Sequence, residues 1–223
     1  FTNAIIDKPN AGSVLQYNLK DAQIEDFGEI SLRGHLISDE KEAQAELSLN
    51  GEVQKLAGWP NGEYTGLIKP IDSNEYGKRT KSGIANGCSF KVNYDRPSQW
   101  SKPEQAWLSG TIGPNYEFDY YPVSRFDSKE KRVLEKYYTE PYYRFENVPE
   151  ELDEPGEYYI DRQSGMLYFY PPEDAPKDSV LTITMSTPTL DVSRKAPNSM
   201  FRIENSKNIV FENLIFKGGR GSA

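Results

Sequence analysis

The sequence predicts an all-β protein: an antiparallel domain of the sandwich or barrel type, followed by the start of a parallel β-helix. Three observations support this prediction. Short alternating apolar segments run through the chain, turn signals recur about every ten residues, and the final segment differs in composition from the rest. We therefore divide the chain into a β-rich domain at residues 1–186 and the first β-helix strands at residues 187–223.

Turn residues between apolar segments predict several hairpins. Residues 46–49 alternate polar and apolar side chains, Asn50-Gly51 follows, and residues 53–57 resume an apolar segment. Asn-Gly favours a tight hairpin turn because both residues accept positive φ angles. The same pattern predicts hairpins of 123–126 with 132–138 and of 157–161 with 166–170, and a further strand at 180–185.

Helical signals are sparse. Residues 38–45 carry a capping-box pattern, Asp39 with Glu42, but no apolar stripe, so we expect a loop or a single helical turn there. Another helical turn is predicted within residues 102–108, after Pro103. Helices therefore contribute little to the predicted fold.

The C-terminal segment has very short apolar strands separated by Asn and Gly. We expect strands at 200–204, 209–211 and 214–216. This pattern is typical of one coil of a parallel β-helix, which needs neighbouring coils to bury its apolar face. An ordinary edge hairpin of the preceding sheet is the alternative. An unpaired edge at 209–216 would favour weak dimerisation or local disorder near residues 218–223.

Charge and composition exclude several classes of protein. Among 223 residues there are 26 Lys and Arg and 34 Asp and Glu, a net charge of −8, which argues against nucleic acid or an anionic membrane as the main partner. Aromatic residues at 13% exclude a disordered chain. The single cysteine, Cys88, excludes an internal disulfide, and no apolar run is long enough to span a membrane. Because the chain starts at Phe1 rather than Met, we expect it to be a piece of a longer protein.

Aromatic residues in loop-like segments are the main functional signal. Sugars stack their apolar C–H faces on aromatic rings, so exposed Trp and Tyr residues favour contact with a polysaccharide or oligosaccharide. The alternative is that the rings fill the core or pack against the β-helix. The candidate residues are Trp59, Trp100, Trp107, Tyr116, Tyr120 and Tyr121.

Two carboxylates, Asp95 and Asp119, lie among these aromatic residues and are candidates for sugar contact or for an acid–base pair. Alternatively they cap turns or pair with Arg96 and Arg125. No metal site is expected, because the loop that starts at Asp72 lacks the calcium-ligand pattern, and no cofactor motif is present.

Three segments, in a fixed order, carry a resemblance to a known family. They are AELSLNGEVQKLAGWPNG at 45–62, FKVNYDRPSQWSKPEQAWLSG at 90–110 and RFENVPEELDEPGEYYIDRQSGMLYFYPP at 144–172, which leads to the Asn-rich segment. This order resembles the β-rich insertion domain near the start of pectate-lyase-like right-handed parallel β-helix proteins. Many of those are bacterial glycoside hydrolases, including glycoside hydrolase family 141.

The resemblance implies an accessory domain of a secreted or cell-envelope bacterial carbohydrate-active enzyme, which packs beside the rest of a parent β-helix and shapes its substrate cleft. The family's catalytic acids are expected on later coils, so no catalytic residue is carried over to this chain. The chain departs from the family pattern at Gly58, where a basic residue is more common. The alternatives are an autonomous carbohydrate-binding module, a catalytic domain that uses Asp95 and Asp119, and a purely structural spacer.

Overall fold

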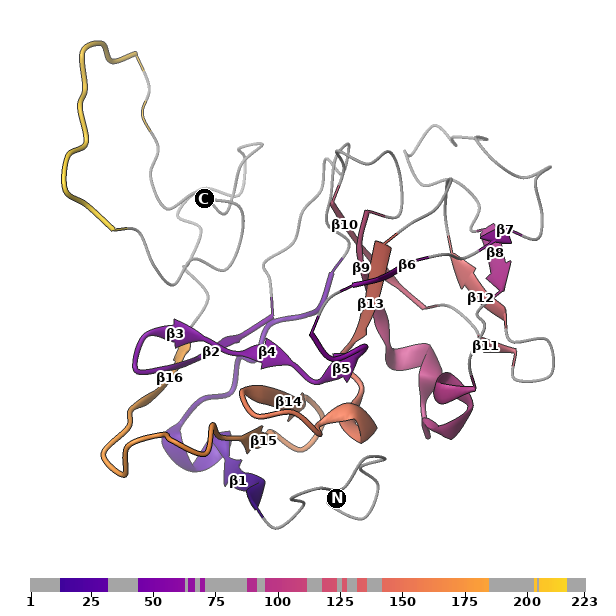
Figure 1. The fold of residues 1–223 in the computed structure, drawn as a ribbon. Coiled ribbons are helices and arrows are strands. Elements are labelled where there is room, and N and C mark those ends of the chain that lie inside the picture. Colours follow the sequence, from indigo (N-terminus) through magenta and orange to yellow (C-terminus); the bar gives the residue numbers. More distant parts are fainter. Residues whose placement is uncertain are drawn as a thin grey trace.

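The structure is a computed structural model. It describes residues 13–31, 44–62, 64–66, 69–70, 88–91, 95–111, 118–123, 126–127, 132–135, 142–184, 203 and 205–215, and only the backbone at 65–66, 69–70, 88–91, 119, 126–127 and 132–135. Within these ranges the chain is β-rich, as predicted (Figure 1). Apart from Ser13, helical structure there consists of the 3-10 turns η3 (Leu19–Ala22), η4 (Arg96–Gln99), η5 (Pro103–Gln105) and η6 (Pro149–Glu151).

The strands form four sheets, here numbered 1 to 4. Sheet 1 has the order β1 (Leu15–Asn18), β15 (Met166–Tyr170), β14 (Glu157–Asp161), β4 (Lys55–Leu56). Sheet 2 has the order β10 (Asp119–Pro122), β9 (Trp107–Gly110), β13 (Tyr142–Glu146), β5 (Gly58–Trp59), and β6 (Thr65–Gly66) also pairs with β13. Sheet 3 has the order β11 (Phe126–Asp127), β12 (Arg132–Glu135), β8 (Cys88–Lys91), β7 (Lys69–Pro70), and sheet 4 the order β16 (Leu181–Thr184), β2 (Glu46–Leu49), β3 (Glu52–Val53).

The described strands pair at each predicted hairpin, but over shorter ranges for two of them. The return strand predicted at 53–57 is divided, since residues 52–53 form β3 and residues 55–56 form β4, which pairs with β14. β2 and β3 pair across Asn50 and Gly51, whose φ angles are 51° and 83°, as the tight turn requires. β14 pairs with β15, and the shorter β11 pairs with β12. All described pairings are antiparallel except that of β14 with β4. The described part of the predicted helical turn near Pro103 is η5.

The main core lies between sheets 1 and 4, which gives this part of the chain a sandwich-like arrangement. Tyr158 and Ile160 of β14 alternate inward, as do Leu167 and Phe169 of β15, and they pack with Leu47 of β2. Leu19 of η3 and Phe27 close the cluster. The period-2 pattern that predicted these strands is therefore the pattern of their burial.

The strands predicted at 209–211 and 214–216 are not formed in the described residues 205–215, and the strand predicted at 200–204 lies outside the described residues except for residue 203. Residues 205–215 form bends and extended backbone without a strand, and Figure 1 shows them apart from the four sheets. Asn205, Asn208 and Asn213 have φ angles of 52°, 60° and 59°, which turn the backbone at each of these residues. Strand hydrogen bonds need a neighbouring strand, and the described residues supply none to this segment. A parallel β-helix and the boundary at residue 187 therefore stay predictions.

Candidate functional site

A buried acidic group joins sheet 1 to sheet 2. We call Glu151, Asp153 and Glu157 the acidic joint; they are 0%, 6% and 0% exposed. Arg96 donates from Nε and Nη2 to Glu151 at 2.6–3.0 Å and from Nη2 to Asp153 at 2.9 Å. Arg144 donates from Nη2 to Glu157 at 2.6 Å. Buried charges persist only when they are paired in this way.

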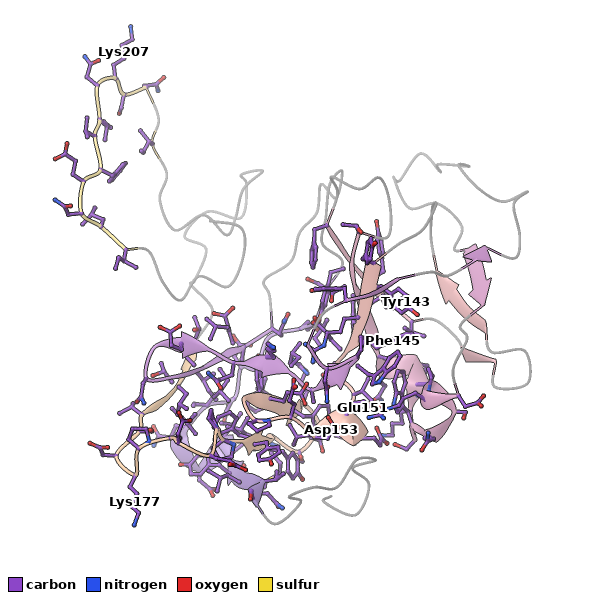
Figure 2. All side chains as sticks on the ribbon, in the orientation of Figure 1. Tyr143, Phe145, Glu151, Asp153, Lys177 and Lys207 are labelled. Atoms are coloured by element: carbon purple, nitrogen blue, oxygen red, sulfur yellow. The ribbon has the colours of Figure 1, made fainter. Side chains whose placement is uncertain are left out.

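Neutral donors complete the acidic joint, of which Figure 2 labels Glu151 and Asp153. The indole Nε1 of Trp100 donates to Glu151 at 2.5 Å, and Asn61 donates to Asp153 at 2.7 Å. Asn61 belongs to the first of the three segments that carry the family resemblance, Trp100 to the second, and the joint itself to the third. The three segments are thus brought together by one set of buried polar contacts.

Three of the predicted sugar-contact residues are buried. Trp100 is 5% exposed and packs edge-on against Phe145, with ring centroids 5.0 Å apart. Tyr120 and Tyr121 of β10 are 9% and 8% exposed. These rings therefore belong to the core, which is the alternative that the sequence left open.

The remaining candidates have different surroundings. Trp59 is half-buried in β5 and precedes Pro60 through a cis peptide bond. Asp95 is exposed at the start of η4, where its carbonyl oxygen accepts from the Ser98 hydroxyl. Only the backbone of Asp119 is described, in β10, and Tyr116 lies outside the described residues. The paired-carboxylate hypothesis therefore stays untested.

Trp107 is the predicted residue that lies at a cavity. It is half-buried at the start of β9 and lines an open cavity of about 550 Å³, here called the Trp107 cleft. The rings of Trp107 and Tyr120 stack, with centroids 5.5 Å apart and planes at 15°. The Tyr120 hydroxyl in turn donates to Glu146 at 2.5 Å. One face of the Trp107 ring is thus packed against Tyr120, whose position is fixed by its hydrogen bond to Glu146.

Two further rings line the same cleft. Tyr159 of β14 and Tyr168 of β15 are direct cross-strand partners, with centroids 6.4 Å apart and planes at 29°. Both are half-buried, because they alternate with the core residues of their strands. In the sequence, only the alternation of side chains along the two strands points to them, because it places them on the face opposite Tyr158 and Phe169.

Polar side chains form the rest of the Trp107 cleft. Asn147, at φ 63° just after β13, donates to the Gln105 carbonyl at 3.1 Å and accepts from Arg162 Nη1 at 3.1 Å. Arg162 also donates from Nε to the Gly28 carbonyl at 3.3 Å. These contacts join four segments of the chain around the cleft. Other polar lining residues are Glu29, Ser101, Lys102, Asp161 and Gln163.

Asp161 is engaged in its own turn. Its carboxylate accepts from the backbone N–H of Gln163 at 3.0 Å and from the Ser164 hydroxyl at 2.7 Å. A carboxylate held in this way by donors of its own turn stays ionised and serves as an acceptor rather than as an acid. The cleft therefore offers three rings and a set of fixed donors and acceptors.

No group of three or more His, Cys, Asp or Glu side chains that could hold a metal ion is found among the described residues. In those same ranges no helix is long and apolar enough to cross a membrane.

Comparisons with known proteins give little further information. No model of a protein family matches the sequence, and no curated protein matches it. A solved structure named "Glycoside hydrolase" is similar over 65% of this chain, with a TM-score of 0.44 and 14% sequence identity. The chain spans 27% of that protein's length.

Proposed function

We propose that this chain is a non-catalytic, carbohydrate-binding accessory domain. The observation that carries the proposal is the Trp107 cleft, in which the rings of Trp107, Tyr159 and Tyr168 lie beside fixed polar groups. The ligand is a polysaccharide or an oligosaccharide cut from one.

The chemistry of the cleft matches that of a sugar. A pyranose ring has an apolar C–H face and a rim of hydroxyls, each of which donates and accepts hydrogen bonds. The aromatic rings can stack on the C–H face. The side chains of Asp161, Lys102 and Gln105 offer charged and amide groups to the sugar hydroxyls. The volume of about 550 Å³ lies within the range of small-molecule sites, and its open shape suits a chain that extends beyond one ring.

The hydrogen bonding and burial of the described carboxyl groups support binding without catalysis. Glycoside hydrolysis needs two carboxylates on either side of the bond, one of them protonated. In the Trp107 cleft Asp161 is hydrogen-bonded within its turn, and the acids of the acidic joint are buried out of reach of a sugar, at 0–6% exposure. Catalysis then belongs to another part of a longer protein.

The accessory role rests on the C-terminal segment. Residues 205–215 expose most of their apolar side chains, with Val210 73% and Ile215 81% exposed. Such a surface is stabilised when it is covered. We propose that further coils of a right-handed parallel β-helix cover it in the parent enzyme. The parent is then a secreted or envelope-bound bacterial protein, and the chain alone dimerises weakly through this segment.

The test is binding of the chain to a panel of soluble polysaccharides, measured by isothermal titration calorimetry and affinity electrophoresis. Trp107→Ala is expected to weaken binding at least about tenfold, which is ~1.4 kcal/mol. Tyr17→Ala is the matched control, because this ring is 50% exposed on β1 and lies outside the cavities described here. Unchanged binding by folded Trp107→Ala, or release of reducing sugar by the chain alone, would overturn the proposal.

A further inference from the structure

A second set of cavities lies along β13 of sheet 2, from Tyr142 to Glu146. Two cavities, of about 490 and 300 Å³, share Gly62 and Tyr64 in their linings, and we call them together the Tyr64 groove. One end of the groove is aromatic and the other is acidic. None of the described candidates predicted from the sequence is among its lining residues.

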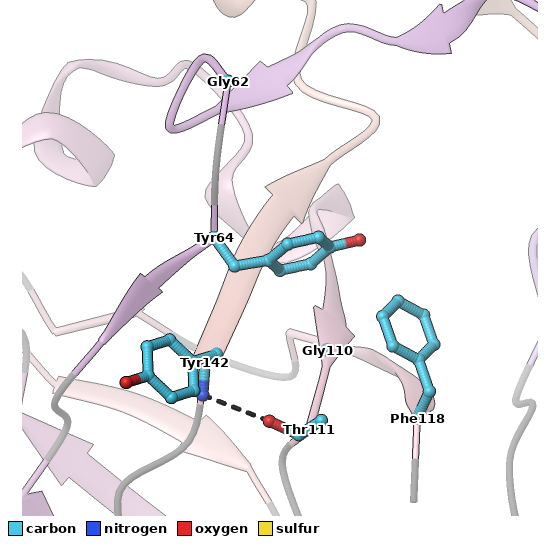
Figure 3. A pocket seen from close by; sticks show the side chains of 6 residues that line it. All are labelled: Gly62, Tyr64, Gly110, Thr111, Phe118 and Tyr142. Atoms are coloured by element: carbon cyan, nitrogen blue, oxygen red, sulfur yellow. Dashed lines mark hydrogen bonds between the residues drawn. The ribbon is translucent and has the colours of Figure 1, made fainter.

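The aromatic end is formed by three exposed rings. Tyr64, Phe118 and Tyr142 are 37%, 56% and 60% exposed, and Figure 3 shows Phe118 and Tyr142 on either side of Tyr64. The rings of Tyr64 and Phe118 are 5.8 Å apart at 85°, so together they present one ring face and one ring edge. Three exposed rings at one cavity form an apolar patch of the kind that marks a binding surface.

The backbone under these rings is closely packed. Gly110 has a φ of 142°, and a Cβ there would lie 2.0 Å from the Tyr142 carbonyl oxygen. The Thr111 hydroxyl accepts from the Tyr142 backbone N–H at 3.4 Å (Figure 3). Tyr142 is therefore exposed on a rigid strand rather than on a free loop.

The acidic end contains Glu46 of β2 and Glu146 of β13. Glu146 accepts from the hydroxyls of Ser109 and Tyr120 at 2.7 and 2.5 Å. Glu46 is half-buried, and none of the hydrogen bonds or ion pairs of the described residues involves its carboxylate. Burial raises its pKa. Its carboxylate oxygens are therefore acceptors that a ligand hydroxyl can reach from the groove.

Two cations also line this end. Arg144 is occupied, since it donates to Glu157 and to the carbonyl oxygens of Gly58 and Leu56. Lys55 is exposed on β4. With Glu46 and Glu146 opposite a single exposed lysine, the groove does not favour an anionic ligand, and the chain's net charge of −8 acts in the same direction.

We infer that the Tyr64 groove is a second glycan subsite, which takes a neutral sugar with its ring face on the aromatic end and its hydroxyls donating to Glu46. The inference shares only its ligand class with the proposed function and needs no contribution from the Trp107 cleft. The aromatic end of the Tyr64 groove and the Trp107 cleft lie at opposite ends of β13, since Tyr142 lines the first and Asn147 the second. At about 3.3 Å per residue these two positions are roughly 17 Å apart. A long glycan that occupies both sites gains avidity over a short one.

The experiment titrates the full chain with neutral β-glucan and xylan oligosaccharides of increasing length, with polygalacturonate and with chitosan oligomers. Glu46→Ala and Tyr142→Ala are made in the native chain and in Trp107→Ala. Glu173→Ala and Tyr17→Ala are matched controls, because these side chains are exposed outside both sites. Circular dichroism checks that each variant folds.

In the Trp107→Ala background, either groove substitution is expected to weaken the remaining binding of neutral oligosaccharide at least about tenfold. In the native chain, either groove substitution is expected to abolish the increase in affinity with oligosaccharide length. Groove variants that bind as their controls do overturn the second subsite and leave the Trp107 cleft standing. If the groove variants lose binding while Trp107→Ala binds as the native chain does, the Trp107 cleft is overturned instead. Tighter binding of polygalacturonate or chitosan overturns the neutral ligand class, and binding of no glycan overturns both proposals.

Discussion

Arg144 Nη2 lies 2.6 Å from Glu157 Oε1, in the interior between β13 of sheet 2 and β14 of sheet 1. Arg144 and Glu157 are 5% and 0% exposed, so this ion pair is shielded from water. Glu157 also accepts from the backbone N–H groups of Asp153 and Glu154, each at 3.2 Å. One carboxylate thus fixes a guanidinium, a turn and the relative position of two sheets.

Removal of this carboxylate tests the role of the pair. Glu157→Met keeps much of the volume but leaves the Arg144 guanidinium buried without its partner, and arginine does not lose its charge. We expect a loss of about 3–5 kcal/mol in the free energy of unfolding, measured by urea denaturation. The control is Lys177→Met at an exposed site (Figure 2), for which we expect a change within about 0.5 kcal/mol. Equal stability of the two variants would show that the pair does not hold the sheets together.

The same carboxyl predicts a pH dependence. Burial raises the pKa of Glu157 to about 8 from 4.5, against the opposing effects of Arg144 and the backbone N–H donors. The folded chain therefore holds this proton more tightly than the unfolded chain does. Its contribution to stability is complete below pH about 4.5 and is lost as the pH rises to about 8.

Denaturation midpoints of the native chain and of Glu157→Gln, measured across that pH range, check this prediction. Glutamine does not titrate, so the native chain is expected to lose more stability than the variant does as the pH rises. Parallel curves for the two proteins would contradict it.

Two glycines predict contrasting outcomes on substitution. A Cβ at Gly58 would lie 2.1 Å from the Phe145 carbonyl oxygen, so Gly58→Ala forces β5 away from β13. Gly62 has a φ of 77° but no atom within 4 Å of the added Cβ, so Gly62→Ala costs only the left-handed conformation, about 1 kcal/mol. We expect a clearly lower melting temperature for Gly58→Ala than for Gly62→Ala. Similar melting temperatures would mean that β5 moves aside without cost.

Tryptophan exposure gives a spectroscopic prediction. Variants that retain a single tryptophan, with Phe at the other two positions, are titrated with iodide. Trp100, at 5% exposure, is expected to resist quenching, whereas Trp107 is quenched and becomes protected when a glycan binds. Strong quenching of Trp100 would contradict the burial of the acidic joint.

Local signals predicted the hairpins correctly because their causes are local. Asn50-Gly51 sets its own turn, and the alternation in 157–161 and 166–170 sets which face each residue occupies. The Trp107 cleft was predicted only through one ring. Its other rings, Tyr159 and Tyr168, lie on the outward face of β14 and β15, where no sequence motif indicates a binding role.

The sequence by itself determined the all-β class, the turns, the inward positions of each strand and the acidic balance, since these follow from short-range sterics and from composition. Only the tertiary structure decided which aromatic residues are core and which are accessible. Trp100 and Trp107 are seven positions apart in similar segments, yet one is bound to Glu151 and the other lines a cleft. Burial depends on what the rest of the chain packs against a ring, and contacts such as that of Trp100 with Glu151 join residues about fifty positions apart.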